Sequence, residues 1–203
     1  CVQALCEAGA NVDQVNARSD TPLMVAAHFG HYECIRTLAS WGAAVNHLGH
    51  RGFVPLIVAS LEGHIACVRL LSSLGGKREV ARPSWIKRWS AERLAEQRGH
   101  TETLSWLRSS RDWTPLHHLE ELSAQRTAEL LRGGASVHAG LPSPLERARR
   151  VESEASALVR LAVEPWSIVT HRFFPPHARA RAVELLRLGY LLAWSPPLRM
   201  RQA

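Results

Sequence analysis

Residues 21–46 read "TPLMVAAHFGHYECIRTLASWGAAVN" and hold two short apolar helical patterns separated by a Gly-His pair. A shift of 33 residues places Pro22 on Pro55 and the Gly-His pair at 30–31 on the pair at 63–64. A fixed period between about 20 and 50 residues is typical of stacked structural repeats. The stretch is therefore one copy of a repeated unit.

The same stretch predicts two helices followed by a loop. Thr21 is a suitable N-cap, and Pro22 suits the first helical position, where a backbone N–H has no partner in any case. Gly30 can end the first helix in a left-handed conformation, and Gly42 can end the second. Residues 46–53, "NHLGHRGF", contain turn-forming Asn and Gly, and they predict an extended finger that joins one helix pair to the next.

The motifs that share this period resemble the ankyrin repeat. They are Thr21-Pro22-Leu23, Gly30-His31, Gly42-Ala43 and Val45-Asn46, with Gly9-Ala10-Asn11-Val12-Asp13 before them and Thr114-Pro115-Leu116-His117 after them. The resemblance covers residues 1–140 well and residues 141–163 poorly. It implies an all-α ankyrin solenoid of stacked helix-turn-helix units, and it implies a protein-protein interaction module rather than an enzyme.

The positions of the motifs divide the chain into units. We expect a truncated repeat at 1–16, repeats at 17–49 and 50–82, a divergent repeat with an insertion at 83–109, a repeat at 110–140, a degenerate repeat at 141–163 and a C-terminal helical extension at 164–203. Because the first unit begins inside the second helix of a repeat, we interpret the chain as a fragment. A repeat array of this length predicts one elongated domain.

Composition gives looser bounds. The net charge of +7 comes almost wholly from Arg, since Lys77 and Lys87 are the only lysines. A basic balance permits an acidic protein partner or nucleic acid without requiring either. No apolar run approaches the roughly 20 residues that span a bilayer, and no basic-then-apolar leader opens the sequence. We expect an intracellular monomer, cytoplasmic or nuclear.

Residues for catalysis, cofactors or metals are not expected. Neither the pair His28 and His31 nor the pair His47 and His50 has a third ligand at a readable distance. The sequence also lacks a nucleophile elbow, a Gly-rich phosphate loop and a pair of carboxylates in a tuning context.

The cysteines follow the repeat. Cys1, Cys34 and Cys67 share one repeat position, and we expect them to fill small spaces in the stack as reduced thiols. Cys6 lies off this row.

The register breaks after Gly75-Gly76, where basic residues between Lys77 and Arg93 are interleaved with Trp85 and Trp89. Such a segment can bind single-stranded nucleic acid through charge and stacking. The alternative, which we favour, is an elongated finger whose tryptophans pack on the array and whose charges are solvated.

A helix is expected over residues 178–194, with Leu185, Leu188 and Leu192 on a broad apolar stripe. It can cover the open end of the array. It can also serve as a docking helix, because animal proteins that join ankyrin repeats to a C-terminal helical box recruit ubiquitin ligase subunits. The layout is similar, although the Leu-Cys-Arg and Leu-Pro-Leu-Pro motifs of that box are absent.

The ankyrin resemblance also implies where a protein partner binds, namely at the finger tips and at the two residues before each Gly-His pair. On this chain these positions are Arg18, Asp20, His28, Phe29, His50, Arg51, Phe53, Leu61, Glu62, Gln97, Arg98, Arg111 and Trp113. Phe29, Phe53 and Trp113 are the strongest candidates, because exposed aromatic side chains often anchor interfaces.

Deletion of residues 165–203 tests whether the C-terminal helix covers the array. If it does, the deletion exposes a large apolar face, and the remaining chain should melt at a lower temperature or aggregate. A truncated protein that stays monomeric with an unchanged melting temperature would instead make the helix a free docking element.

Overall fold

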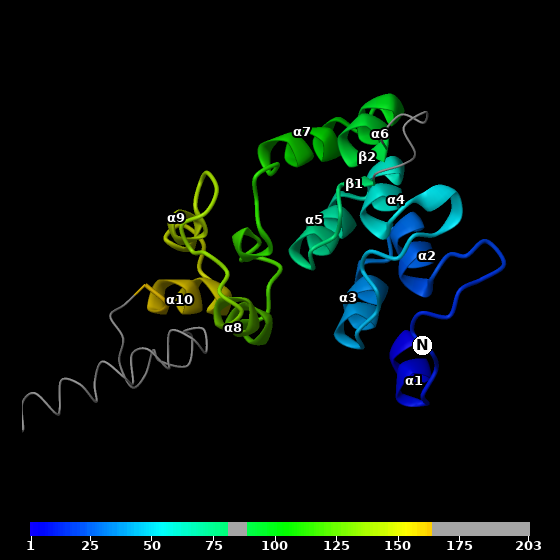
Figure 1. Ribbon diagram of the computed structural model, residues 1–203, viewed down its shortest axis with the longest axis horizontal. Coiled ribbons are helices and arrows are strands. Elements are labelled where there is room, and N and C mark those ends of the chain that lie inside the picture. Colours follow the sequence, from blue (N-terminus) through cyan, green and yellow to red (C-terminus); the bar gives the residue numbers. More distant parts are fainter. Residues whose placement is uncertain (81–88, 164–203) are drawn as a thin grey trace, which may run out of the picture.

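The computed structural model describes residues 1–80 and 89–163, and its first part is a stack of paired helices (Figure 1). The helices of this part are α1 (Val2–Glu7), α2 (Pro22–His28), α3 (Tyr32–Ser40), α4 (Pro55–Glu62), α5 (Ile65–Ser73), α6 (Ala91–Arg98) and α7 (Thr101–Ser109). The inner helices α2, α4 and α6 pack on one another, and the outer helices α1, α3, α5 and α7 do the same. This confirms the all-α solenoid that the sequence period predicts.

The helices begin and end where the sequence indicates. The Thr21 hydroxyl accepts a hydrogen bond from the Met24 N–H at 3.4 Å, and the Ser90 hydroxyl caps α6 in the same way. Gly30 and Gly42 both have positive φ, at 71° and 84°. Only glycine adopts this backbone conformation without steric cost, so these two residues end each helix sharply.

Small and branched apolar side chains fill the space between the helices. Leu23, Ala27, Leu56 and Ala59 are fully buried on the inner helices. The alanines leave room for the close approach of neighbouring helices, while the leucines supply most of the buried apolar area. Cys67 is buried as expected, whereas the other members of its row are half-buried (Cys34) or exposed (Cys1).

Two histidine rings, His64 and His100, each join a repeat to the repeat before it. His64 Nε2 lies 3.0 Å from the carbonyl oxygen of His28, and His100 Nε2 lies 3.0 Å from the carbonyl oxygen of Leu61. Because a carbonyl only accepts, Nε2 donates in both bonds. Each ring also lies over the glycine of the repeat before it, His64 over Gly30 and His100 over Gly63. A Cβ on Gly30 would come within 2.7 Å of His64, and a Cβ on Gly63 within 2.5 Å of His100.

The insertion contains the only strands in the described residues. β1 (Glu79–Val80) pairs with β2 (Trp89–Ser90) in antiparallel register, and residues 81–88, including Trp85, lie outside the described residues. Arg78, one of the basic residues of the insertion, points inward. Its guanidinium donates to the Leu107 carbonyl at 3.1 Å and to the Ser72 and Ser110 hydroxyls. Donors of its guanidinium are therefore used inside the protein and not for a phosphate group.

The stack changes direction after α7. Residues 41–54 link α3 to α4, but only residues 110–114 link α7 to the next element, which is the short 3-10 helix η2 (Pro115–His117). η2 packs on the outer helix α5. Because the connection is short, it holds η2 close to the end of α7 instead of returning the chain along an extended finger.

A second helical unit follows this change of direction. It consists of η2, α8 (Ala124–Arg132), α9 (Pro144–Ala148) and α10 (Glu154–Leu161), and its own core is formed by Leu116, Leu119, Leu122, Leu131, Ala148, Ala155 and Val159. Figure 1 shows α8–α10 on the side of α3 and α5 that is opposite the inner helices. The Tyr32 hydroxyl donates to Glu121 at 2.6 Å across this contact. The sequence predicts one elongated array, and the structure instead folds the last units back onto the outer helices.

Substitution of Gly63 tests the contact between repeats. Gly63→Ala places a methyl group against the His100 ring, in addition to the strain of a positive φ. Gly99 has a similar φ of 74° with open space around it, so Gly99→Ala carries the strain alone, about 1–2 kcal/mol. We expect Gly63→Ala to lower the free energy of unfolding by about 1–3 kcal/mol more than Gly99→Ala in denaturant titrations. Equal losses would show that the histidine contact does not constrain the stack.

Candidate functional site

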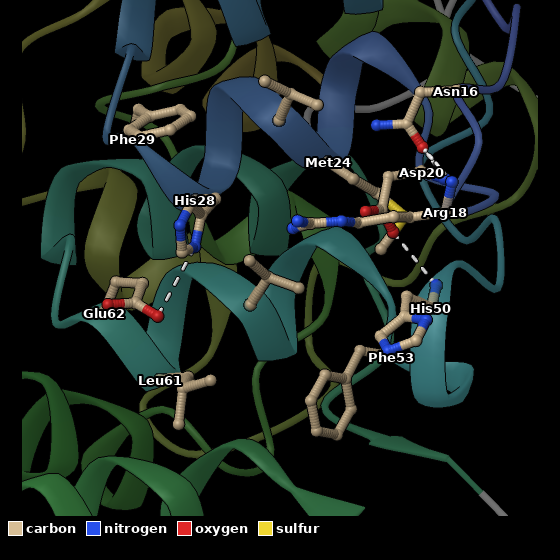
Figure 2. Close-up of a pocket in the computed structure, with 12 residues that line it drawn as sticks. Asn16, Arg18, Asp20, Met24, His28, Phe29, His50, Phe53, Leu61 and Glu62 are labelled. Atoms are coloured by element: carbon tan, nitrogen blue, oxygen red, sulfur yellow. Dashed lines mark hydrogen bonds and ion pairs between the residues drawn. The ribbon is translucent and has the colours of Figure 1, made fainter.

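A hollow in the described structure lies between α2, α4 and the loops that precede them (Figure 2). We call it the finger groove. Its volume is about 710 Å³, and it is lined by Asn16, Arg18, Asp20, Met24, Val25, His28, Phe29, His50, Phe53, Val58, Leu61 and Glu62. The loops supply one wall, and the two inner helices supply the floor and the other wall.

Hydrogen bonds hold the loop wall in place. The Asn16 side-chain oxygen accepts from the backbone N–H groups of Arg18 and Asp20, at 2.8 and 3.0 Å. Asp20 Oδ1 accepts from the backbone N–H of His50 at 2.9 Å, which ties the finger of one repeat to the finger of the next. A Cβ on Gly49 would collide with Met24 and Asp20, so the second loop lies directly on the first repeat. The wall is thus fixed before any partner binds.

The floor of the finger groove is apolar. Met24 and Val58 are buried at 3% and 9% exposure, and Val25 and Leu61 flank them. Phe29 stands at the rim with 60% of its surface exposed. Its ring meets the His28 ring edge-on at 4.8 Å and stacks on the His31 ring at 6.1 Å. These contacts hold a large aromatic side chain at the entrance of the groove.

Charged groups lie at opposite sides of the finger groove. The Glu62 carboxylate lies 3.4 Å from His28 Nδ1 at the helix side. Arg18 lies at the loop side, and Figure 2 shows its side chain extending across the groove towards His28. No hydrogen bond or ion pair of its guanidinium is found within residues 1–80 and 89–163.

Residues 1–82 match the family model for ankyrin repeats, in three copies. Over these residues the chain is similar to ankyrin repeat proteins. No curated protein matches its sequence. Among solved structures, the crystal structure of the human ASB11 ankyrin repeat domain is similar, with 26% sequence identity, coverage of 91% of this chain and 90% of that chain, and a TM-score of 0.48. Ankyrin repeats are in general non-enzymatic scaffolds for protein-protein interaction.

Most of the positions predicted from the ankyrin resemblance come together in the finger groove. Arg18, Asp20, His28, Phe29, His50, Phe53, Leu61 and Glu62 all line it. Arg51 lies in the short 3-10 helix η1 (His50–Gly52) of the second loop. The prediction missed the wall residue Asn16 and the apolar lining residues Met24, Val25 and Val58. The repeat period relates Val25 to Val58, and this pairing was the available signal for two of them.

The remaining predicted positions lie elsewhere on the ankyrin array. Gln97 and Arg98 are exposed at the end of α6, outside the finger groove, and Arg111 is exposed in the connection after α7. The expectation that Arg111 and Trp113 lie on a finger is wrong, because residues 110–114 form a direct link without one.

Trp113 is half-buried at the junction between the two helical units. Its ring stacks on His117 at 5.8 Å and meets Trp106 and His118 edge-on at 6.1 and 5.4 Å. The Arg147 guanidinium lies over the same indole ring, 4.2 Å from its centroid. The tryptophan therefore joins the ankyrin array to the second unit, and the expectation of an exposed aromatic at this position is wrong.

His118 is a buried ionisable group of this junction, 3% exposed. Its Nε2 lies 3.2 Å from the Ser72 hydroxyl, and its ring lies against Trp106. Burial lowers the pKa of His118 to about 3, and the nearby positive charge of Arg78 and Arg147 adds to the shift. His118 is thus neutral in the folded protein, and burial also lowers the pKa of His117 beside it.

The described residues contain no group of His, Cys, Asp or Glu side chains able to hold a metal ion. Within the same part of the chain, every helix is too short or too polar to cross a membrane.

The junction predicts that acid destabilises the protein. Because the pKa of His118 is about 3 when folded and about 6.5 when unfolded, the unfolded chain takes up the proton first. The contribution of neutral His118 to the free energy of unfolding is therefore fully present above pH 6.5. It is lost as the pH falls towards 3, at up to about 1.4 kcal/mol per pH unit.

The measurement is the free energy of unfolding at pH 7 and pH 5 for wild type, His118→Gln and His138→Gln. His138 is exposed and serves as the matched control. We expect a smaller loss between the two pH values in His118→Gln than in the other two proteins. The same loss in all three would contradict a buried neutral His118.

Proposed function

We propose that the protein binds a partner protein by accepting a segment of it in the finger groove. The observation that carries this proposal is the gathering of eight predicted contact residues around one hollow of about 710 Å³ with an aromatic side chain at its rim. Binding sites of this kind combine an apolar floor with a few well-placed polar groups. No reaction has to take place there, only complementary contact.

Rigidity of the finger groove supports the proposal. The loop wall is held by the Asn16 and Asp20 hydrogen bonds, and the floor belongs to the packed helices α2 and α4. A preformed site requires little ordering when a partner binds, so more of the contact energy appears as affinity. Phe29 is the proposed anchor, because large aromatic side chains often dominate the energy of an interface.

A second hollow, of about 630 Å³, lies between the outer helices and the second unit. We favour the finger groove over it for two reasons. The arginines of the second hollow already have partners, since Arg36 pairs with Glu33 and Arg126 pairs with Glu129. The finger groove also contains the positions that the ankyrin resemblance implies. Gln97 and Arg98 extend the proposed surface along the stack towards α6.

The alternatives have less support. The adaptor role for ubiquitin ligases depends on the helix expected at 178–194, which lies outside the described residues and stays a prediction. Nucleic-acid binding by the insertion loses Arg78, which is bonded internally. An intracellular location and a monomeric state also stay predictions.

Substitution of Phe29 tests the proposed function. Phe29→Ala removes the rim anchor from a side chain that is 60% exposed, so the fold should be retained. The matched control is Trp41→Ala, because Trp41 is 46% exposed at the end of α3 and lies outside the finger groove. Proteins captured from cell extract by wild type are quantified for both variants.

We expect at least one captured protein to lose affinity by about 30-fold with Phe29→Ala, the usual size of an interface hot spot. Trp41→Ala should leave its capture unchanged. Equal capture by all three proteins would exclude the finger groove as the binding site.

A further inference from the structure

We infer that the segment bound in the finger groove carries a carboxylate at the loop side, an apolar side chain over the floor and a basic residue at the helix side. This inference rests on the proposed function and adds the chemistry of the partner and its direction in the groove. It follows from which charged groups of the groove are already paired and which are not.

Arg18 provides the site for the carboxylate. The other charged groups of the groove have partners, since Asp20 accepts the His50 N–H and Glu62 lies beside His28. Nothing in the described part of the chain pairs with the Arg18 guanidinium, whose planar set of donors matches the two oxygens of a carboxylate.

The surroundings of Arg18 strengthen such a pair. Its side chain extends across the groove (Figure 2), whose lining includes the apolar side chains of Met24, Val25 and Val58. A segment that covers this floor excludes water from the guanidinium, and a charge-assisted hydrogen bond gains strength as the local dielectric constant falls. The apolar side chain of the partner and its carboxylate should therefore be close in sequence.

The helix side of the groove has the opposite character. The Glu62 side chain remains 29% exposed despite its contact with His28. Glu62 is also the last residue of α4, where the helix dipole adds partial negative charge. A second carboxylate is repelled there, whereas a Lys or Arg side chain is attracted. The two sides together give the bound segment a direction.

The test uses random 12-residue peptides displayed on phage and selected on the full chain. Wild type should enrich peptides in which a large apolar residue has Asp or Glu close to it on one side and Lys or Arg on the other side. Arg18→Glu should enrich peptides in which the acidic residue is replaced by a basic one. Arg36→Glu, on the outer helix α3, is the matched charge control and should select the wild-type pattern.

Binding of one selected peptide then gives the magnitude. Arg18→Glu should weaken it about tenfold or more, since the substitution removes charge-assisted hydrogen bonds and places two carboxylates together. Replacement of the acidic peptide residue by Lys should restore binding to Arg18→Glu. Unchanged melting temperatures of the variants show that the fold is intact.

The outcomes separate this inference from the proposed function. If the peptides lose binding with Phe29→Ala but wild type and Arg18→Glu select the same pattern, the groove is the binding site and the inferred chemistry is wrong. If the peptides bind equally well to Phe29→Ala and to wild type, the proposed function itself is wrong.

Discussion

The contact between a histidine ring and the glycine of the preceding repeat is the constraint on which the rest of the structure depends. His64 lies over Gly30 and donates to the His28 carbonyl, and His100 repeats this with Gly63 and Leu61. The contact sets how closely α4 follows α2. The width of the finger groove follows from that spacing, because α2 and α4 provide its floor. Glycine is thus required at these positions for two reasons: the backbone has a positive φ, and the histidine ring occupies the space of a Cβ.

The length of the connections decides where the regular stack ends. A Gly-His pair precedes each of α3, α5 and α7, whereas Leu122 and Ser123 precede α8. α8 therefore begins without the histidine contact. The link of residues 110–114 also has no finger. The second unit is held instead by a junction of aromatic and basic side chains around Trp113 and His118. Its position over α3 and α5 leaves the inner face of the array as the open one.

This arrangement assigns different roles to the two faces. The outer helices carry the contact with the second unit, including the bond from Tyr32 to Glu121, where burial and the neighbouring carboxylate raise the pKa of the tyrosine to about 12. The inner face keeps the exposed Phe29 ring and the Arg18 guanidinium. The hydrogen bonds of the fingers order the scaffold before a partner binds, and the Arg18 charge beside them is unpaired within the described residues. This arrangement suits recognition, because little ordering is required on binding.

The sequence by itself determined the repeat, the helix ends and most of the finger groove. Thr21, Pro22 and Gly30 act through local backbone chemistry, and a fixed period then brings equivalent positions such as His28 and Glu62 side by side. Only the tertiary structure decided the fate of residues 110–163. The local sequence around Trp113 is the same whether the side chain lies at the tip of a finger or packs against His117. The local sequence also does not distinguish Arg78 from an arginine on the surface. Trp113 is packed because the short link after α7 brings η2 onto α5, whereas Arg78 donates to α5 and to the end of α7. Contacts between segments so far apart in the chain leave no periodic pattern in the sequence.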